Sequence, residues 1–169
     1  SSAYVTLYIG GNRSGKTVGG AVESVYRLLG KHPYKKIPEA PVRGRAIAVD
    51  FNYGVDMIMI PQISQYVPPS YLINGSWEDS YDREHRLLTL TNKSTLEFRS
   101  YEQDLDKFAG TSRHFMWFDE EPPKHIYTEC MARLVDTNGI AYLTMTPLDG
   151  MTWVYEDLYT KGLEGDPNI

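Results

Sequence analysis

The stretch Gly10-Gly11-Asn12-Arg13-Ser14-Gly15-Lys16-Thr17 decides the fold of this chain. It fits the pattern G-x-x-x-x-G-K-[ST], in which a glycine-rich loop curls its backbone amides around phosphate oxygens. Lys16 adds a mobile positive charge for β- and γ-phosphates, and Thr17 offers a hydroxyl to Mg²⁺. The pattern therefore predicts a nucleotide-phosphate site, whose contacts are Gly11, Asn12, Arg13, Ser14, Gly15, Lys16 and Thr17.

The segments on either side of this loop have the character that the motif requires. Tyr4 to Ile9 is rich in β-branched and aromatic residues, which is typical of a strand. After the loop, apolar residues recur at steps of four, three and four, as on one face of a helix: Val18, Val22, Val25 and Leu29. Gly30 stands where a helix would end. The order strand, loop, helix favours a true phosphate loop over a chance glycine-rich turn.

Composition and charge narrow the class of protein. The 169 residues are enough for one domain with a real core, and the composition is typical of a soluble globular protein. No apolar run approaches the roughly 20 residues needed to span a membrane, and no signal peptide begins the chain. A single cysteine, Cys130, excludes an internal disulfide. The net charge of −5 argues against a constitutive nucleic-acid binder but allows a local basic surface.

One segment, residues 31–45, is clearly basic. Three prolines interrupt it and predict a long loop, in which Glu39 is the single acid among five cations: Lys31, Lys35, Lys36, Arg43 and Arg45. Such a run is either a solvated loop or a contact for a nucleic-acid backbone, which needs clustered cations.

The middle of the chain gives weaker signals. Ala46 to Val49 is a short apolar run typical of a buried parallel strand, and Asp50 would lie at its carboxyl end or cap the following turn. The apolar stretch 55–63 has no clear type. Leu87 to Leu90 and Ser94 to Arg99 flank a turn and predict a hairpin. Two further segments predict helix: 101–110, as a short helix plus loop, and 125–135, with Ile126, Met131 and Leu134 facing inward.

The second strong signal is Phe115-Met116-Trp117-Phe118-Asp119-Glu120. Four bulky apolar residues suit a central strand buried on both faces, so the two acids emerge at its carboxyl end, beside the phosphate loop. Asp119 would hold Mg²⁺ together with Thr17, and Glu120 would deprotonate the water that attacks the γ-phosphate. Glu121 is either a spare acid or a supporting one, and the sequence alone does not order the pair.

A last strand is predicted at residues 140–147, ending in Thr144-Met145-Thr146-Pro147. In a parallel sheet it would lie beside the strand that precedes the phosphate loop. Thr144 or Thr146 would then sense the γ-phosphate, and we assign Thr146 to the nucleotide site. The fold class expected from these segments is α/β, with a central, mostly parallel sheet flanked by helices.

Several of these segments, taken together, resemble the large terminase subunit of tailed bacteriophages. Beside the phosphate loop, the resemblance rests on four stretches in chain order: Phe98-Arg99-Ser100-Tyr101-Glu102-Gln103, Phe108-Ala109-Gly110-Thr111, Trp117-Phe118-Asp119-Glu120-Glu121-Pro122 and Thr144-Met145-Thr146-Pro147-Leu148. The resemblance implies a P-loop ATPase of the additional-strand, catalytic-glutamate (RecA-like) type. It further implies that ATP and Mg²⁺ power the translocation of viral double-stranded DNA into the procapsid.

The resemblance also implies partners and two arginines. The partners would be double-stranded DNA, the portal protein and the small terminase subunit. The protein would form a homo-oligomeric ring on the capsid portal and act in the host cytoplasm, without a membrane. Arg13 would match an arginine often found in terminase phosphate loops, so the catalytic residues implied are Lys16, Glu120 and Arg13. A neighbouring subunit would add an arginine finger, for which Arg113 is the first candidate and Arg99 and Arg133 are alternatives.

Two departures and two alternatives accompany this interpretation. The chain is too short for the C-terminal nuclease domain of terminases, and only nine residues precede Gly10, where an adenine-contacting segment is normal. We therefore expect residues 1–169 to be a single ATPase domain, as a fragment of a longer protein. The alternatives are a helicase-like DNA translocase and a nucleotide-binding assembly module that does not hydrolyse ATP.

Overall fold

The computed structural model describes residues 4–147 and 152–169. Seven strands form one sheet: β1 (Tyr4–Ile9), β2 (Arg43–Ala48), β3 (Tyr81–Asp82), β4 (Leu87–Thr89), β5 (Thr95–Ser100), β6 (Phe115–Asp119) and β7 (Ile140–Met145). The helices are α1 (Lys16–Leu29), α2 (Ile60–Tyr66), α3 (Trp77–Ser80), α4 (Lys124–Ala132) and α5 (Thr160–Leu163). Shorter or irregular turns of helix are η1 (Phe51–Met59), η2 (Pro69–Tyr71), η3 (Ile73–Gly75), η4 (Leu105–Phe108), η5 (Val135–Thr137) and η6 (Tyr155–Tyr159).

The sheet is mixed but mostly parallel, with the order β1-β7-β6-β2-β5-β4-β3. The first five strands in this order are parallel, and β4 and β3 continue the sheet antiparallel. The predictions of a mostly parallel sheet and of a strand beside the one before the phosphate loop are confirmed, since β7 pairs with β1 along its whole length. Because parallel strands share a carboxyl edge, the loop after β1 and the acids at the carboxyl end of β6, Asp119 and Glu120, meet there.

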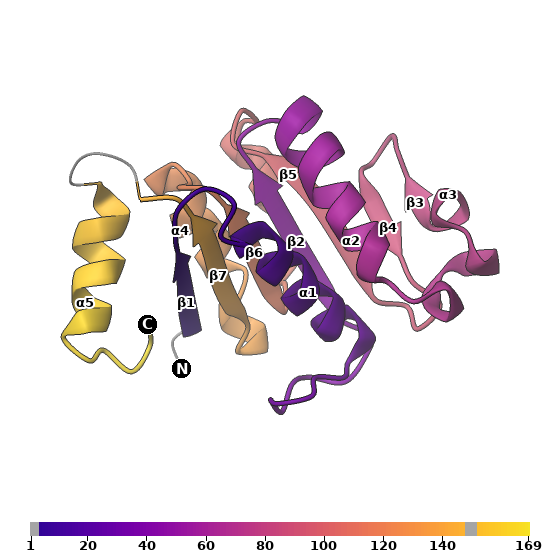
Figure 1. Ribbon diagram of the computed structural model, residues 1–169, viewed down its shortest axis with the longest axis horizontal. Helices are drawn as coiled ribbons and strands as arrows, with labels where there is room; N and C mark the ends of the chain where they lie inside the picture. Colours follow the sequence, from indigo (N-terminus) through magenta and orange to yellow (C-terminus); the bar gives the residue numbers. More distant parts are fainter. Residues whose placement is uncertain (1–3, 148–151) are drawn as a thin grey trace.

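Helices cover both faces of the sheet (Figure 1). In the figure α1 and α2 lie on one face, α4 lies on the other, and α5 lies beside β1 at the end of the sheet. Side chains that alternate along the strands divide the core accordingly: Trp117 and Tyr142 belong to the α1 side, whereas Phe118 and Leu143 belong to the α4 side. Every residue of β6 is buried, as predicted for a central strand.

Several local predictions are confirmed and some are corrected. The hairpin is present as β4 and β5, Gly30 ends α1 in the left-handed conformation, and the Asp50 carboxylate accepts hydrogen bonds from the amides of Tyr53 and Gly54, as a cap. The predicted loop 31–45 ends earlier, because β2 already begins at Arg43. The untyped stretch 55–63 is helical, a wide π-type turn that runs into α2. No described helix is long and apolar enough to cross a membrane.

Close packing between α1 and β6 depends on Gly20. A Cβ atom at this position would overlap the indole ring of Trp117, whereas a Cβ atom at the exposed Gly19, one residue earlier, would meet nothing within 4 Å. We expect Gly20→Ala to lower the free energy of unfolding by about 1–3 kcal/mol through overpacking. Gly19→Ala should raise it by roughly 0.5–1 kcal/mol, because alanine favours helix. Urea denaturation of both variants measures the difference, and equal effects would contradict the close packing of Gly20 against Trp117.

Candidate functional site at the carboxyl edge of the sheet

The loop between β1 and α1 has the conformation of a phosphate cradle. Gly15 adopts φ +83° and Arg13 φ +62°, both in the left-handed region, so the chain turns sharply before α1 begins at Lys16. Gly10 is so close to Ser14 that an added Cβ would lie 2.7 Å from its Oγ atom. Lys16 bends back over the loop and donates from Nζ to the carbonyl oxygen of Gly11 at 2.8 Å. The loop thus leads into the N-terminus of α1 and holds the Lys16 ammonium group beside its backbone, an arrangement suited to binding an anion.

A chain of hydrogen bonds joins this loop to the acids after β6. Thr17 Oγ1 donates to Asp119 Oδ1 at 3.3 Å, although the two residues are 102 positions apart. Thr144 Oγ1 donates to the same carboxylate oxygen at 2.7 Å and accepts a bond from Trp117 Nε1 at 2.8 Å. Magnesium prefers oxygen ligands and keeps water and phosphate around it, so the Thr17 hydroxyl and the Asp119 carboxylate fit that ion.

Burial changes the acidity of Asp119. Loss of solvent raises the pKa of its carboxyl above the usual value; the hydrogen bond from Thr144 opposes this effect, and the charge of Glu120 adds to it. Because a buried carboxylate is costly without a counter-charge, a cation beside Asp119 would lower the energy of the ionised form.

Thr146 links the carboxylate of Glu120 to the phosphate loop. Its backbone is left-handed, with φ +62°, and its carboxylate accepts a hydrogen bond from the Thr146 amide at 3.0 Å. The Thr146 hydroxyl lies 3.4 Å from Glu120 Oε1 and 3.3 Å from Asn12 Oδ1 in the loop. Of the two threonines left open by the sequence, Thr146 lies at the loop and Thr144 lies buried beneath Asp119.

The neighbouring acid, Glu121, is placed differently. Its Oε2 atom is buried and has no hydrogen-bond partner among the described residues. The contacts to Thr146, by contrast, are made by the carboxylate of Glu120. The geometry therefore selects Glu120 rather than Glu121 as the acid that faces the phosphate loop.

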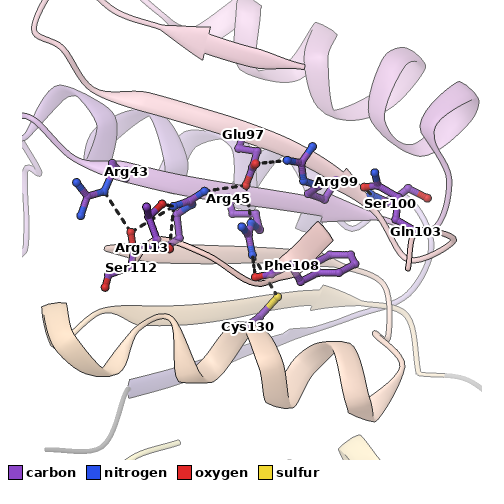
Figure 2. Close-up of polar contacts among 11 residues, drawn as sticks. Arg43, Arg45, Glu97, Arg99, Ser100, Gln103, Phe108, Ser112, Arg113 and Cys130 are labelled. Carbon is purple, nitrogen blue, oxygen red and sulfur yellow. Dashed lines mark hydrogen bonds and ion pairs between the residues drawn. The ribbon is translucent and has the colours of Figure 1, made fainter. Parts of the chain in front are cut away.

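The arginine candidates lie in two settings. Arg13 is exposed at the tip of the phosphate loop. Arg113 precedes β6, at the amino end of that strand, and its side chain is 12% exposed and donates to Glu97 at 3.0 Å. Figure 2 shows Arg45 and Arg99 on the same glutamate. Arg113 and Arg99 are thus held within the chain, which does not suit a finger that must reach a neighbour, and Arg133 pairs with Glu129 at 3.3 Å.

The basic segment is less basic at the surface than its sequence suggests. Arg45 is 1% exposed and donates to Glu97 and to the carbonyl oxygen of Phe108. Lys35 pairs with Glu23 at 3.4 Å, and Arg43 Nε donates to the carbonyl oxygen of Ser112. As a surface for a nucleic-acid backbone, the segment therefore lacks Arg45, because that side chain lies inside the fold.

Two residues of the site escaped sequence reasoning. Trp117 supports Thr144, and the Tyr101 hydroxyl donates to the carbonyl oxygens of Asp119 and Glu120 at 3.2 and 3.0 Å. Trp117 counted only as one of four bulky residues in a strand. Tyr101 belongs to the stretch Ser100 to Gln103, which stood out in the sequence without an assigned role.

Known proteins resemble this chain in sequence and in fold. The family described as terminase large subunit, T4likevirus-type, N-terminal, matches residues 7–167. The large terminase subunit of Salmonella phage P22 is 40% identical over 67 residues, which are 40% of this chain and 13% of that protein. Two structures of the large terminase from a thermophilic bacteriophage, one of them in complex with ADP, share the fold with TM-scores of 0.76 and 0.65 at 16% identity. Each of these two matches covers 96% of this chain and 38% of the thermophilic phage's chain, so the chain spans well under two thirds of these relatives.

Proposed function

Since the chain belongs to the terminase large-subunit family, T4-like N-terminal type, we propose that it hydrolyses ATP with Mg²⁺ and that this hydrolysis drives viral double-stranded DNA into a procapsid. One observation carries the proposal: the phosphate loop and the acids after β6 meet through Thr17 and Asp119 at 3.3 Å, with Glu120 facing the loop. The domain would be a P-loop ATPase of the additional-strand, catalytic-glutamate type.

The residues have distinct roles in this proposal. The loop amides, Lys16 and the N-terminus of α1 bind the β- and γ-phosphates and stabilise the charge that builds up on them during transfer. Thr17 and Asp119 hold Mg²⁺, which when bound neutralises charge between the phosphates. Glu120 accepts a proton from the attacking water, since a carboxylate within hydrogen-bond reach of that water can act as a general base. Thr146, between Glu120 and Asn12, is placed to respond when the γ-phosphate leaves.

The arginines divide between this subunit and its neighbours. Arg13, exposed on the loop, would reach the phosphates of its own subunit. A trans-acting finger would come from a neighbour in a ring, and the ion pair between Arg113 and Glu97 leaves the choice of that arginine open. The further partners in this proposal are the portal protein, the small terminase subunit and double-stranded DNA, in the host cytoplasm. The thermophilic phage terminase solved with ADP supports the choice of nucleotide.

Replacing Lys16 by alanine tests the nucleotide site. We expect kcat/KM for Mg-ATP to fall by roughly 10²–10³, because a charge that stabilises the transferring phosphoryl group is lost. Steady-state phosphate release and calorimetric ATP binding measure the effect. Lys36→Ala, which removes an exposed lysine outside the loop, is the matched control and should leave both values unchanged.

Other outcomes would redirect the proposal. Hydrolysis that survives Lys16→Ala would contradict a phosphate site on this loop. Measurable ATP affinity with no hydrolysis in the unaltered chain would favour a nucleotide-binding assembly module. Strand separation without capsid-dependent DNA uptake would favour a helicase-like translocase.

A further inference from the structure

Tyr101 connects the end of β5 to the end of β6, across the intervening strand β2. Its amide donates to the carbonyl oxygen of Ala48 at the end of β2, at 2.9 Å. Its hydroxyl extends to β6 and lies 3.2 Å from the carbonyl oxygen of Asp119 and 3.0 Å from that of Glu120. One side chain therefore contacts the backbone of both acids that the proposed chemistry uses.

The hydroxyl can act here only as a donor. Among the residues that the structure describes, its two partners are both carbonyl oxygens, so its single hydrogen is shared between them. The tyrosine hydroxyl therefore donates to the backbone of both acids.

Glu120 needs such support because its backbone conformation is unfavourable. A left-handed residue other than glycine costs roughly 1–2 kcal/mol. The residue is nevertheless fixed at three points: its amide donates to the Thr144 carbonyl at 2.8 Å, its carbonyl accepts from Tyr101, and its carboxylate accepts from the Thr146 amide. Of these three bonds, only the one from Tyr101 is donated by a side chain, whereas backbone amides donate the other two.

The turn around Tyr101 is itself tied down by its neighbours, two of which Figure 2 labels. The Ser100 amide donates to Gln103 Oε1 at 3.2 Å, and Ser100 Oγ donates to the Val49 carbonyl at 3.1 Å. The Glu102 amide lies 3.1 Å from Ser100 Oγ. The Ser-Tyr-Glu-Gln stretch is thus one unit, in which Ser100 and Gln103 close the turn that presents the tyrosine.

We propose that Tyr101 is a positioning residue for ATP hydrolysis: its hydroxyl holds the left-handed turn at Glu120 that directs the general base to the phosphate loop. The inference rests on the proposed function, since it takes Glu120 as the base. It assigns a role to the Ser-Tyr-Glu-Gln stretch, which the proposed chemistry leaves without one.

Tyr101→Phe tests the inference by removing one oxygen atom. We expect kcat for ATP to fall about tenfold while KM changes less than twofold, because the phosphate loop is untouched and only the base is misaligned. The matched control is Tyr142→Phe, which removes another buried hydroxyl, one that bonds to Ser24 of α1 and to no acid. It should leave kcat unchanged, and thermal unfolding of both variants checks that each is folded.

Amide hydrogen exchange at Thr146 gives a readout that does not depend on hydrolysis. If Tyr101 holds Glu120, Tyr101→Phe should speed exchange at Thr146 about tenfold and leave the β7 amides of residues 141–143 unchanged, and Tyr142→Phe should not affect Thr146. Unchanged exchange at Thr146, or an unchanged kcat despite faster exchange, would overturn the role of Tyr101. If the unaltered chain does not hydrolyse ATP, the proposed function fails, and the exchange rate alone then decides whether Tyr101 holds the turn.

Discussion

Glu120→Gln should retain ATP binding and lose turnover, with kcat lowered by roughly 10³. Glutamine has nearly the shape of glutamate and can still accept the hydrogen bond from the Thr146 amide, so the turn and the phosphate loop should persist. What it lacks is the ability to take a proton from water. Phosphate release under single-turnover conditions and calorimetric ATP affinity separate the two effects.

Glu121→Gln is the natural control for this experiment. The two acids are adjacent, but it is Glu120 that contacts Thr146, and Glu121 keeps an oxygen buried without a partner among the described residues. Hydrolysis in Glu121→Gln should therefore stay near the value of the unaltered chain. Normal turnover in Glu120→Gln, or a loss of turnover in Glu121→Gln alone, would exchange the roles of the two residues and refute the proposed base.

Glu97→Gln should have the largest effect on stability, a loss of about 3–5 kcal/mol in the free energy of unfolding at pH 7. Three guanidinium groups surround this one carboxylate, which is 9% exposed: those of Arg45 at 2.6 Å, Arg113 at 3.0 Å and Arg99 (Figure 2). A neutral amide would leave three positive charges together with no counter-charge. Urea denaturation at pH 7 measures the loss.

The pH dependence of that loss has a defined sign. Burial by itself raises the pKa of Glu97, but the charges of Arg45, Arg99 and Arg113 outweigh it, so the pKa lies below the usual value of 4.5. A lowered carboxyl pKa stabilises the fold at pH values above the unfolded pKa, and this stabilisation disappears as the pH falls through the folded pKa. The difference between the unaltered chain and Glu97→Gln should therefore be full at pH 7 and shrink below pH 4.5.

A surface ion pair provides the comparison for Glu97. Glu129 pairs with Arg133 one helical turn away, with side chains 26% and 31% exposed. Because both side chains are still partly open to solvent, which screens the pair, Glu129→Gln should cost no more than about 1 kcal/mol. A similar cost for both variants would mean that the arginines around Glu97 find other partners when the charge is removed.

The two halves of the candidate site could be predicted to lie together because each half is a local signal. The phosphate loop follows from spacing and glycine conformation, and the acid strand follows from four apolar residues that end in two carboxylates. Each of these two signals depends on a few neighbouring residues, so it can be recognised without knowing the rest of the fold. The pairing of β7 with β1 joins residues 4–9 to residues 140–145, and it was predicted by placing both segments in one mostly parallel sheet.

The remaining parts depend on contacts between distant segments. A loop over residues 31–45 predicts Arg45 to be a surface cation. Because β2 begins at Arg43 and lies between β5 and β6 in a sheet covered on both faces, Arg45 is buried instead, opposite Glu97 of β5. Likewise, the assignment of Thr146 rather than Thr144 to the phosphate loop depends on the fold, because the Thr144 hydroxyl bonds to Asp119 instead. The role of Tyr101 depends on a hydroxyl that reaches β6 across the neighbouring strand β2.

The Trp117 indole has a mechanical consequence. The ring lies against Gly20 of α1 on one side and donates to Thr144 of β7 on the other, so it sets the spacing between the helix that follows the phosphate loop and the two strands that carry the acid and its supporting threonine. These three elements should behave as a rigid block during a catalytic cycle. In the proposed DNA-packaging motor, force would then have to come from movement of this block against other parts of the assembly, rather than from opening and closing within it.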